Sequence, residues 1–573
     1  MKKIYIGIIS LFLISCNDFL DTRSYTQKNE TNFPANENDM QSALDAVYAR
    51  LNYDNKVNVP MFADIMSDDM FGGGAENDTH VLALENFMVN DMNTWEPIWK
   101  KSYEAILRAN FLIQNIDQIT WSDLENRNRI LGEAHFLRSF HYFDLARIFG
   151  NIPMPLDYRK PENLPQVSPH VLYGQIAYDM KEAINLIPAV TFPEIKEKDL
   201  GSATKWAAEA MMGRIFLFYT GRFNVSEIKL SDGSIITKSD VIRWIDDCAL
   251  NSGHSLVSDF RNLWPYAAIL PGCYKYRDDN NLSWCGNGKE ATEDVFSIVC
   301  GIFGNKLEVF HNTRMRLTGW RSQDRVPIGQ GSGFCTVNPQ LYYGWFDDPN
   351  YENDIRRNAS ILNAKSEEEA NKDGCEGELF FDRTLGNPYH VTYFFDKKNS
   401  PAAEFKTEPP YTADSKSVNI CVRLFGTTTA FRQCQAVNVK IIRLADVYLM
   451  GAELGSSHAQ EYLDKVRSRA GLASIPVTLE NIKKERRYEL AFEGVRYWDL
   501  LRWHDEAELD KVVRVPVYNG AMGLRYLTCK YRPETEGLLP IPLQEIKKSN
   551  GVLKQNPGWS DTPNYDPSIN YQE

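Results

Sequence analysis

Between Lys440 and His504 the chain repeats apolar residues at spacings of three and four, and this pattern constrains the fold more than any other feature. Residues so spaced line one face of an α-helix, so each run predicts a helix with one buried side. The runs are Ile441, Ala445, Tyr448 and Ala452; Ala459, Leu463, Val466 and Ala470; and Tyr488, Ala491, Val495 and Trp498. The connections are short, which favours antiparallel helical hairpins.

The N-terminal part carries the same signal. Long helices are predicted within 99–110 and 130–149, and a further pair within 171–186 and 203–219. Pro153 and Pro155 follow the first pair and end it, because proline cannot continue a helix. Helical pairs that recur without a strict repeat length indicate tetratricopeptide-like stacking. The chain is therefore predicted to be mainly α.

Residues 222–440 differ from both ends of the chain. Asn, Gly, Asp and aromatic residues dominate there, helical periodicity is weak, and turn pairs such as Asp232-Gly233 are frequent. Because the aromatic and branched residues can still be buried, we expect a large irregular, loop-rich lobe inserted into the helical scaffold. Residues 60–95 are also predicted to be rich in loops. Their glycine triplet, 72–74, lacks the Lys-Ser/Thr of a phosphate loop and indicates a flexible loop.

Charge and cysteine content exclude some classes of function. The net charge of −13 and the pI near 5.4 argue against a nucleic-acid partner, because phosphate binding needs a basic face. The ten cysteines include no CxxC pair, so neither a zinc site nor a dense disulfide framework is indicated. Loop proximity allows one bridge, between Cys273 and Cys285.

Residues 1–15 have the features of a secretion signal. Lys2 and Lys3 precede an apolar run that is too short to span a bilayer as a helix. The run ends in Leu13-Ile14-Ser15-Cys16, which resembles a bacterial lipobox. That resemblance implies that Cys16 becomes the mature N-terminus and carries acyl chains, in which each buried CH₂ contributes about 0.8 kcal/mol to membrane binding. Residues 16–40 would then form an acylated, polar tether.

Three longer strings resemble a known family, the SusD/RagB-like outer-membrane lipoproteins of Bacteroidetes. They are Arg443-Leu-Ala-Asp446-Val-Tyr-Leu-Met-Gly-Ala-Glu453, Val466-Arg-Ser-Arg469-Ala-Gly471-Leu, and Glu485-Arg-Arg-Tyr-Glu489-Leu-Ala-Phe-Glu493-Gly-Val-Arg496-Tyr-Trp-Asp499. The resemblance covers both ends of the chain and leaves the middle lobe without specific motifs. It implies a helical part over 41–221, a ligand-binding lobe over 222–440 and a second helical part over 441–573.

The same resemblance implies a function. Proteins of this kind are lipid-anchored at the cell surface in the outer membrane, where they cover a SusC-like TonB-dependent barrel and pass it an extracellular oligo- or polysaccharide. No bond is broken, and no cofactor or metal is implied. Capture of peptides, as in RagB-like importers, is an alternative within the family. A surface glycoside hydrolase is an alternative outside it.

The sequence offers little support for an enzyme. It contains no HExxH, GxSxG, Walker A or Rossmann fingerprint. Neighbouring acids such as Asp68 and Asp69 rarely form a glycosidase pair, because the two carboxyls must flank a bond at a set separation. Glu485, Glu489 and Glu493 lie one turn apart beside several arginines, which predicts a structural ion-pair network.

The aromatic residues of the lobe carry the candidate ligand site. A sugar ring has an apolar C–H face and a rim of hydroxyls, so its site needs flat aromatic rings beside hydrogen-bonding side chains. Two predicted loops combine both, and Asp68 and Asp69 on the early loop are expected to add acceptors. The candidates on the two loops are Tyr274, Tyr276 and Trp284, and Trp320, Arg321 and Asp324.

Overall fold

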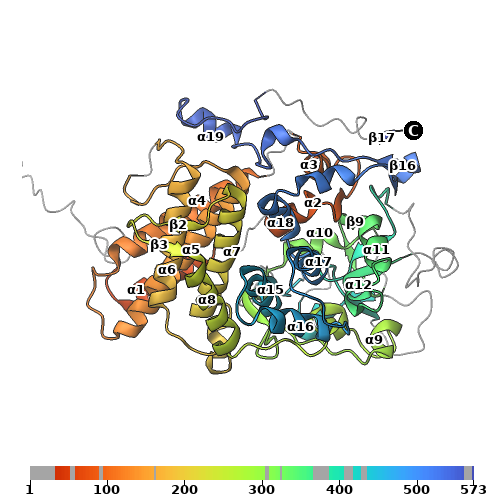
Figure 1. Cartoon of the computed structure of the whole chain (residues 1–573), viewed down its shortest axis with the longest axis horizontal. Helices are drawn as coiled ribbons and strands as arrows, with labels where there is room; N and C mark the ends of the chain where they lie inside the picture. The colour runs from red at the N-terminus through yellow and green to blue at the C-terminus, as the bar shows by residue number, and fades with distance from the viewer. Residues whose placement is uncertain are drawn as a thin grey trace, which may run out of the picture.

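Long helices fill one side of the molecule, an irregular lobe fills the other, and further helices from the C-terminal part lie between them (Figure 1). The computed structural model describes residues 33–51, 59–88, 95–160, 163–302, 309–322, 326–364, 386–405, 417–427, 435–560 and 571–572. In this part of the chain, no helix is both long enough and apolar enough to cross a membrane.

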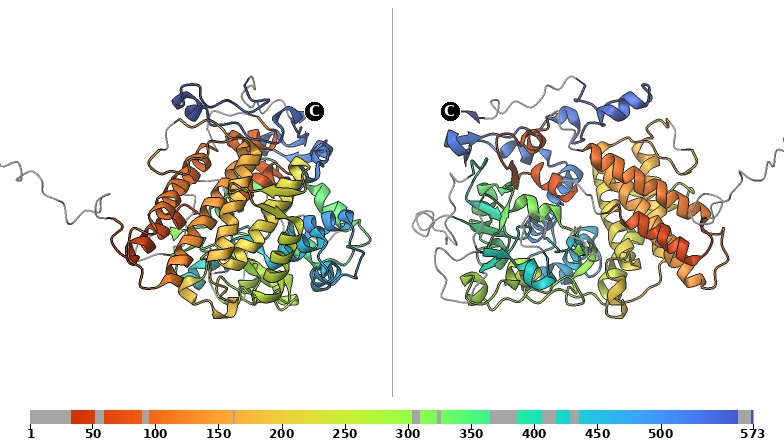
Figure 2. Two further views of the ribbon diagram at one scale, coloured as in Figure 1. Left: turned by 60° about the vertical axis from the view of Figure 1, so that its left-hand side comes forward. Right: turned by 180° about the vertical axis from the view of Figure 1, so that it is seen from behind.

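The helical side, called the frame below, confirms the predicted pairs. Consecutive helices from α4 to α8 pack against one another, and Figure 2 shows them as a stack. The frame consists of α1 (Glu37–Tyr48), α4 (Glu96–Asn115), α5 (Leu124–Phe149), α6 (Pro169–Leu186), α7 (Lys205–Phe223) and α8 (Lys238–Asn251). Helix α8 lies within the range predicted to be irregular.

Helix α5 forms the centre of the frame, and every residue from Gly132 to Phe149 is buried. A buried polar group joins it to its two neighbours. Arg138 donates to both carboxylate oxygens of Asp179 on α6, at 2.8 and 2.6 Å, and to Asn110 on α4 at 2.8 Å. Burial alone would raise the pKa of Asp179, but Arg138 and His135 lower it to about 2. The frame is therefore held by a paired charge as well as by apolar packing.

The C-terminal part supplies α15 (Leu444–Leu454), α16 (Ala459–Arg469), α17 (Leu479–Glu489) and α18 (Arg496–Trp503). Helix α15 packs on α8, α16 and α17, and α18 packs on α7. The predicted helical hairpins are confirmed with two corrections. Ile441 belongs to a strand, β14 (Val439–Arg443), which pairs with β4 (Asp294–Ile298), and helix α15 begins only after this strand, at Leu444.

The second correction concerns the third apolar run, which is split between two helices. Phe492 and Gly494 have a left-handed backbone conformation, with φ values of 63° and 72°, and they separate α17 from α18. A Cβ on Gly494 would lie 2.3 Å from the Cα of Pro60, so only glycine permits this approach of the N-terminal chain. Lys398 binds the carbonyl oxygens of Glu489 and Ala491, which the end of α17 leaves open.

The lobe is built around a small antiparallel sheet with strand order β1-β9-β11-β10. Its strands are β1 (Met70–Gly73), β9 (Phe334–Val337), β11 (Phe394–Asp396) and β10 (Ile361–Asn363). The prediction of a flexible loop at the glycine triplet is therefore wrong. Position 72 of β1 is a glycine because a Cβ there would lie 2.8 Å from the carbonyl oxygen of Val81. Without a side chain at this position, α3 (Thr79–Glu85) can pack closely over the strand.

The remaining elements are short, as predicted for an irregular lobe. The helices are α2 (Val59–Ile65), α9 (Lys275–Asp279), α10 (Thr313–Thr318), α11 (Pro339–Phe346), α12 (Ile355–Ser360), α14 (Ile420–Phe425) and α19 (Leu543–Lys548). Strands that matter below are β7 (Trp320–Arg321), β8 (Gln330–Gly331), β15 (Val515–Tyr518) and β16 (Leu524–Leu527). Cys273 and Cys285 are not bonded to each other, so the bridge considered between them is not formed.

Candidate functional site

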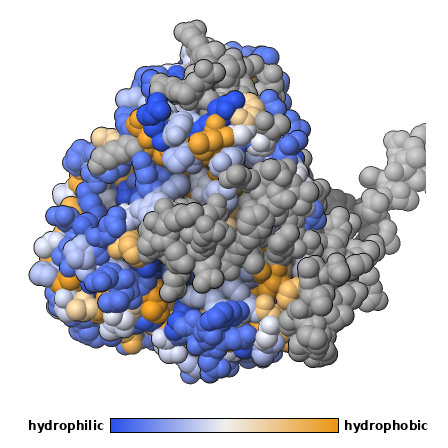
Figure 3. Space-filling view, turned by 90° about the vertical axis from the view of Figure 1, so that its right-hand side faces the viewer, coloured by the Kyte–Doolittle hydropathy of each residue, from blue (hydrophilic) through white to orange (hydrophobic). Residues whose placement is uncertain are grey.

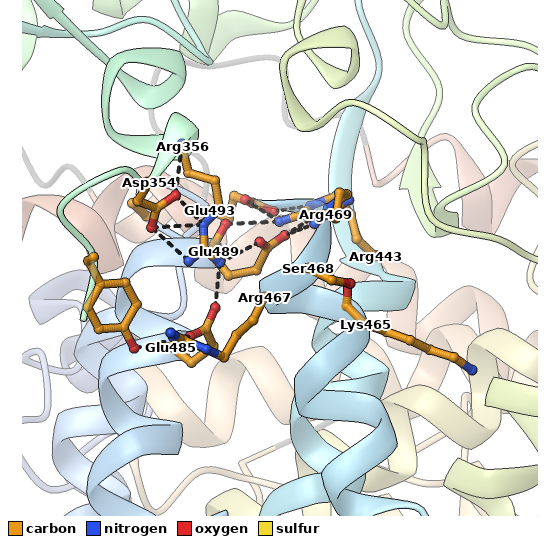
Figure 4. A network of polar contacts seen from close by, with 12 residues as sticks. Asp354, Arg356, Arg443, Lys465, Arg467, Ser468, Arg469, Glu485, Glu489 and Glu493 are labelled. Atoms are coloured by element: carbon orange, nitrogen blue, oxygen red, sulfur yellow. Dashed lines mark hydrogen bonds and ion pairs between the residues drawn. The ribbon is translucent and has the colours of Figure 1, made fainter. Parts of the chain in front are cut away.

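A buried ion-pair network joins the C-terminal helices to the lobe (Figure 4). Glu489 accepts hydrogen bonds from Arg443 at 2.9 Å, from Arg356 at 3.0 Å and from Arg469. Glu485 binds Arg356 at 2.6 Å and Arg467 at 2.8 Å. These contacts confirm the predicted structural network and add cations from α12, α16 and β14.

The electrostatics of Glu489 match this role. Burial disfavours its charged form, but Arg469, Arg443 and Arg356 outweigh that effect and hold its pKa well below the usual range. The carboxylate therefore stays ionised at all physiological pH values. The side chain is 0% exposed and has no proton to donate to a substrate, so the network is architectural.

Asp68 and Asp69 are part of the same kind of arrangement. Both side chains are buried. Asp68 accepts two hydrogen bonds from Arg496, each at 2.9 Å, and Asp69 accepts two from Arg487 at 3.0 and 2.7 Å. These contacts attach the start of β1 to α17 and α18. Contrary to the expected open acidic loop, the two carboxylates face arginines inside the protein.

Tyr274 and Tyr276 surround a cation of the chain itself. The Nζ atom of Lys397 lies 3.5 Å from the ring centre of Tyr276, 5.2 Å from that of Tyr274 and 5.0 Å from that of Tyr266. The ammonium group also donates to the carbonyl oxygen of Asn358 at 2.9 Å. Tyr274 is buried and Tyr276 is half-buried, so most of this aromatic surface already binds Lys397.

Trp320 is buried, although it was expected to lie on an open loop. Its side chain is 0% exposed and lies in a cluster with Ile328, Leu362 and Phe395. The reason is that β7 pairs with β8 and continues the packed interior of the lobe. Tyr518 on β15 is half-buried and packs against this cluster. In this structure Trp320 belongs to the cluster against which Tyr518 packs, and it has no face open to a ligand.

Arg321, the next residue along the strand, reaches the surface. It donates to the carbonyl oxygen of Gly386 at 3.1 Å and pairs with Asp78 at 3.4 Å. The side chains of Arg321 and Asp78 are 28% and 23% exposed, so both can meet a ligand. The early acidic segment therefore does approach the second predicted loop, but through Asp78 rather than through Asp68 or Asp69.

Backbone hydrogen bonds connect this pair to Tyr518. Tyr389 donates to Gly74, Val391 and Tyr518 exchange two bonds, and Gly520 donates to Pro388. We call the segments 74–78, 320–322, 386–393 and 518–520 the loop cluster. Tyr393 and Tyr518 contribute half-buried rings to it, with centres 6.2 Å apart and planes at 71°. Neither tyrosine stands out in the sequence, because isolated rings between β-type residues resemble ordinary core residues.

Trp284, the remaining aromatic candidate, lies in the lobe. Trp284 is half-buried and meets Phe425 edge to face, with ring centres 6.2 Å apart. Asp324 and Cys16 lie outside the described residues. Within the described ranges, no group of three or more His, Cys, Asp and Glu side chains is arranged to hold a metal ion. The visible surface on the lobe side is largely hydrophilic, with hydrophobic residues in small separate patches (Figure 3).

The fold and the loop cluster define a class of protein: a tetratricopeptide-like helical frame that presents aromatic and charged loop residues on an attached lobe. Two family models match the chain. One is described as the SusD family and matches residues 337–559, and the other is described as "Starch-binding associating with outer membrane" and matches residues 18–217. The chain belongs to the SusD family.

Individual relatives agree over nearly the whole length. The SusD-like protein P25 of Formosa agariphila is 23% identical, and the alignment covers 97% of this chain and 98% of that protein. A solved laminarin-binding SusD-like protein is 25% identical with a TM-score of 0.68, covering 92% of this chain and 100% of the other. Surface glycan-binding protein A from Bacteroides thetaiotaomicron in complex with laminarihexaose is 22% identical with a TM-score of 0.64, covering 90% and 98%.

Proposed function

We propose that this chain is a non-catalytic lipoprotein of the bacterial cell surface that binds an extracellular oligo- or polysaccharide. Acyl chains on Cys16 would hold it in the outer membrane, and a SusC-like TonB-dependent barrel would receive the glycan. The observation that carries the proposal is the full-length likeness to a laminarin-binding SusD-like protein. Association with the outer membrane is supported by the description of the N-terminal family model.

The loop cluster is the proposed glycan site. Tyr518 and Tyr393 offer ring surface for the C–H face of a sugar, and Arg321 and Asp78 offer a donor and an acceptor for its hydroxyls. Trp320 serves as the packed support of Tyr518. Tyr276 and Trp284 remain candidates for further contacts, because each ring is half-buried.

The test is binding of the soluble chain, begun after Cys16, to a panel of polysaccharides and peptides, with the products examined for cleavage. We expect retention of one glycan class without cleavage. Tyr518→Ala should weaken that binding about fivefold, because one stacking contact is worth about 1 kcal/mol. Tyr178→Ala, which removes a half-buried tyrosine from α6 of the frame, is the matched control and should bind normally.

The other outcomes identify the alternatives. Retention of peptides alone would change the ligand class and leave capture as the activity. Release of shortened glycans would show a hydrolase and overturn the non-catalytic proposal. Normal binding by a folded Tyr518→Ala variant would move the site away from the loop cluster, and melting temperatures establish whether the variant is folded.

A further inference from the structure

A cavity of about 430 Å³ lies on the frame, between α4 and the C-terminal helix α19. None of its lining residues belongs to the four segments of the loop cluster. Trp99 and Tyr103 of α4 line it together with three leucines and two prolines. The ring centres of Trp99 and Tyr103 are 5.0 Å apart. Cavities of this size are typical of small-ligand sites in proteins.

Hydrogen bonds within the protein hold the walls of the cavity in place without a bound ligand. The Tyr103 hydroxyl donates to the carbonyl oxygen of Pro153 at 2.7 Å. Tyr142 and Asn110 both donate to that of Pro155, at 2.7 and 2.8 Å. A site with preformed walls loses little conformational entropy on binding, so even a small ligand can be held.

Helix α19 covers the cavity, and its partly buried Ile546 packs against the core. None of its residues is buried, and Leu543 at its start is 53% exposed. The chain that follows is nevertheless anchored, because Asn556 donates to the carbonyl oxygens of Phe149 at 3.0 Å and Leu539 at 2.7 Å. Helix α19 is thus held at the surface beside the cavity by Ile546 and by the anchored chain that follows it.

The charges around the cavity select against an ionic ligand. Lys100 and Glu104 come from α4, and Glu545 and Lys548 come from α19. The four formal charges cancel, and Lys548 pairs with Glu545 at 2.8 Å. These side chains can donate to and accept from hydroxyl groups, while the rings and leucines offer an apolar floor. A neutral molecule with an apolar face and a polar rim matches this lining.

We propose that the cavity between α4 and α19 is a second glycan-binding site, which takes a terminal ring of a neutral oligosaccharide. This inference rests on the proposed function for the ligand class, and it adds a site on the frame that is separate from the loop cluster. A chain with two sites would retain a long glycan more firmly than either site alone, because the second contact becomes intramolecular.

The test uses the soluble chain begun after Cys16 and isothermal titration with neutral oligosaccharides, laminarihexaose first. The chain should bind two molecules of a short oligosaccharide. Leu107→Trp places a bulky ring in the cavity from a position that is 40% exposed, and it should reduce the stoichiometry to one. Leu124→Trp, at a position 67% exposed outside the cavity, is the matched control and should retain both sites.

Two further variants separate this inference from the proposed function. In Tyr518→Ala the cavity site should remain, and adding Glu545→Ala should then weaken the remaining binding about tenfold. If Leu107→Trp and Glu545→Ala leave stoichiometry and affinity unchanged while the unaltered chain binds glycan, the cavity proposal is overturned and the proposed function stands. If the cavity variants abolish all binding and Tyr518→Ala changes nothing, the cavity proposal stands and the loop cluster is not the site. Failure of the unaltered chain to bind any neutral glycan would overturn both.

Discussion

Glu489 illustrates how one buried side chain can depend on many others. It accepts charge-assisted bonds from three arginines of three different elements, so its removal leaves several buried cations without their anion. Breaking a buried ion pair in this way costs about 3–5 kcal/mol. Glu489→Ala should therefore lower the free energy of unfolding by about that amount, as measured in urea, and leave glycan binding by the folded fraction intact.

The exposed Glu480 on the same helix supplies the control, because Glu480→Ala removes a carboxylate from solvent and should change stability little. Loss of binding at an unchanged melting temperature in Glu489→Ala would contradict an architectural role.

The sequence allowed the acids of this network to be predicted, since they recur at one-turn spacing. It could not identify their partners: Arg356 is 129 residues from Glu485 in the sequence, and only the folded chain joins them.

At the level of elements, helices were predictable and short strands were not. The apolar repeats of α4–α7, α15 and α16 extend over several turns, so each of these helices has a local sequence signal. Strand β1 has four residues, two of them glycine, and it exists because β9 and α3 pack against it. A pattern that depends on partners elsewhere in the chain leaves no local signal, and the glycines were therefore taken for a flexible loop.

Gly73 of β1 offers a test of this explanation. Its φ is 69°, and a Cβ there would lie 2.4 Å from the carbonyl oxygen of Gly333. Gly233 has a φ of 86° but no atom within 4 Å of its Cβ position, so it shares the backbone conformation without the close contact. Gly73→Ala should cost about 1–3 kcal/mol more in unfolding free energy than Gly233→Ala. Equal costs in urea denaturation would mean that the contact with Gly333 is unimportant.

On the scale of the whole molecule, the candidate site could be predicted only in part. Arg321 was found because it lies beside aromatic and polar residues in the sequence, and it does reach the loop cluster. Tyr274 and Tyr276 have an equally suitable sequence neighbourhood, yet the fold places Lys397 against their rings. The loop cluster is assembled from four separate segments, so neighbourhood in the sequence is a poor guide to its membership.

The buried carboxyls of the whole molecule predict an unusual dependence of stability on pH. Asp179 and Asp446 have folded-state pKa values lowered to about 2 by their arginines against the effect of burial, so the stability they provide is lost as pH falls from about 4 to 2. Burial raises the pKa of Asp64 to about 7 and that of Glu209 to about 8.

These two groups act in the opposite direction. Between their ordinary values near 4 and their raised values, the folded chain keeps a proton that the unfolded chain has released, so each rise in pH lowers the free energy of unfolding. The two effects together place maximum stability at about pH 4–5, with a decline toward both pH 2 and pH 8. Urea unfolding at pH 3, 5 and 8 measures this directly.

Glu209→Gln should reduce the decline from pH 5 to 8, because its side chain no longer ionises, whereas Glu197→Gln at an exposed position should not. A stability that rises steadily from pH 5 to 8 would show that the raised pKa values do not govern the folded chain.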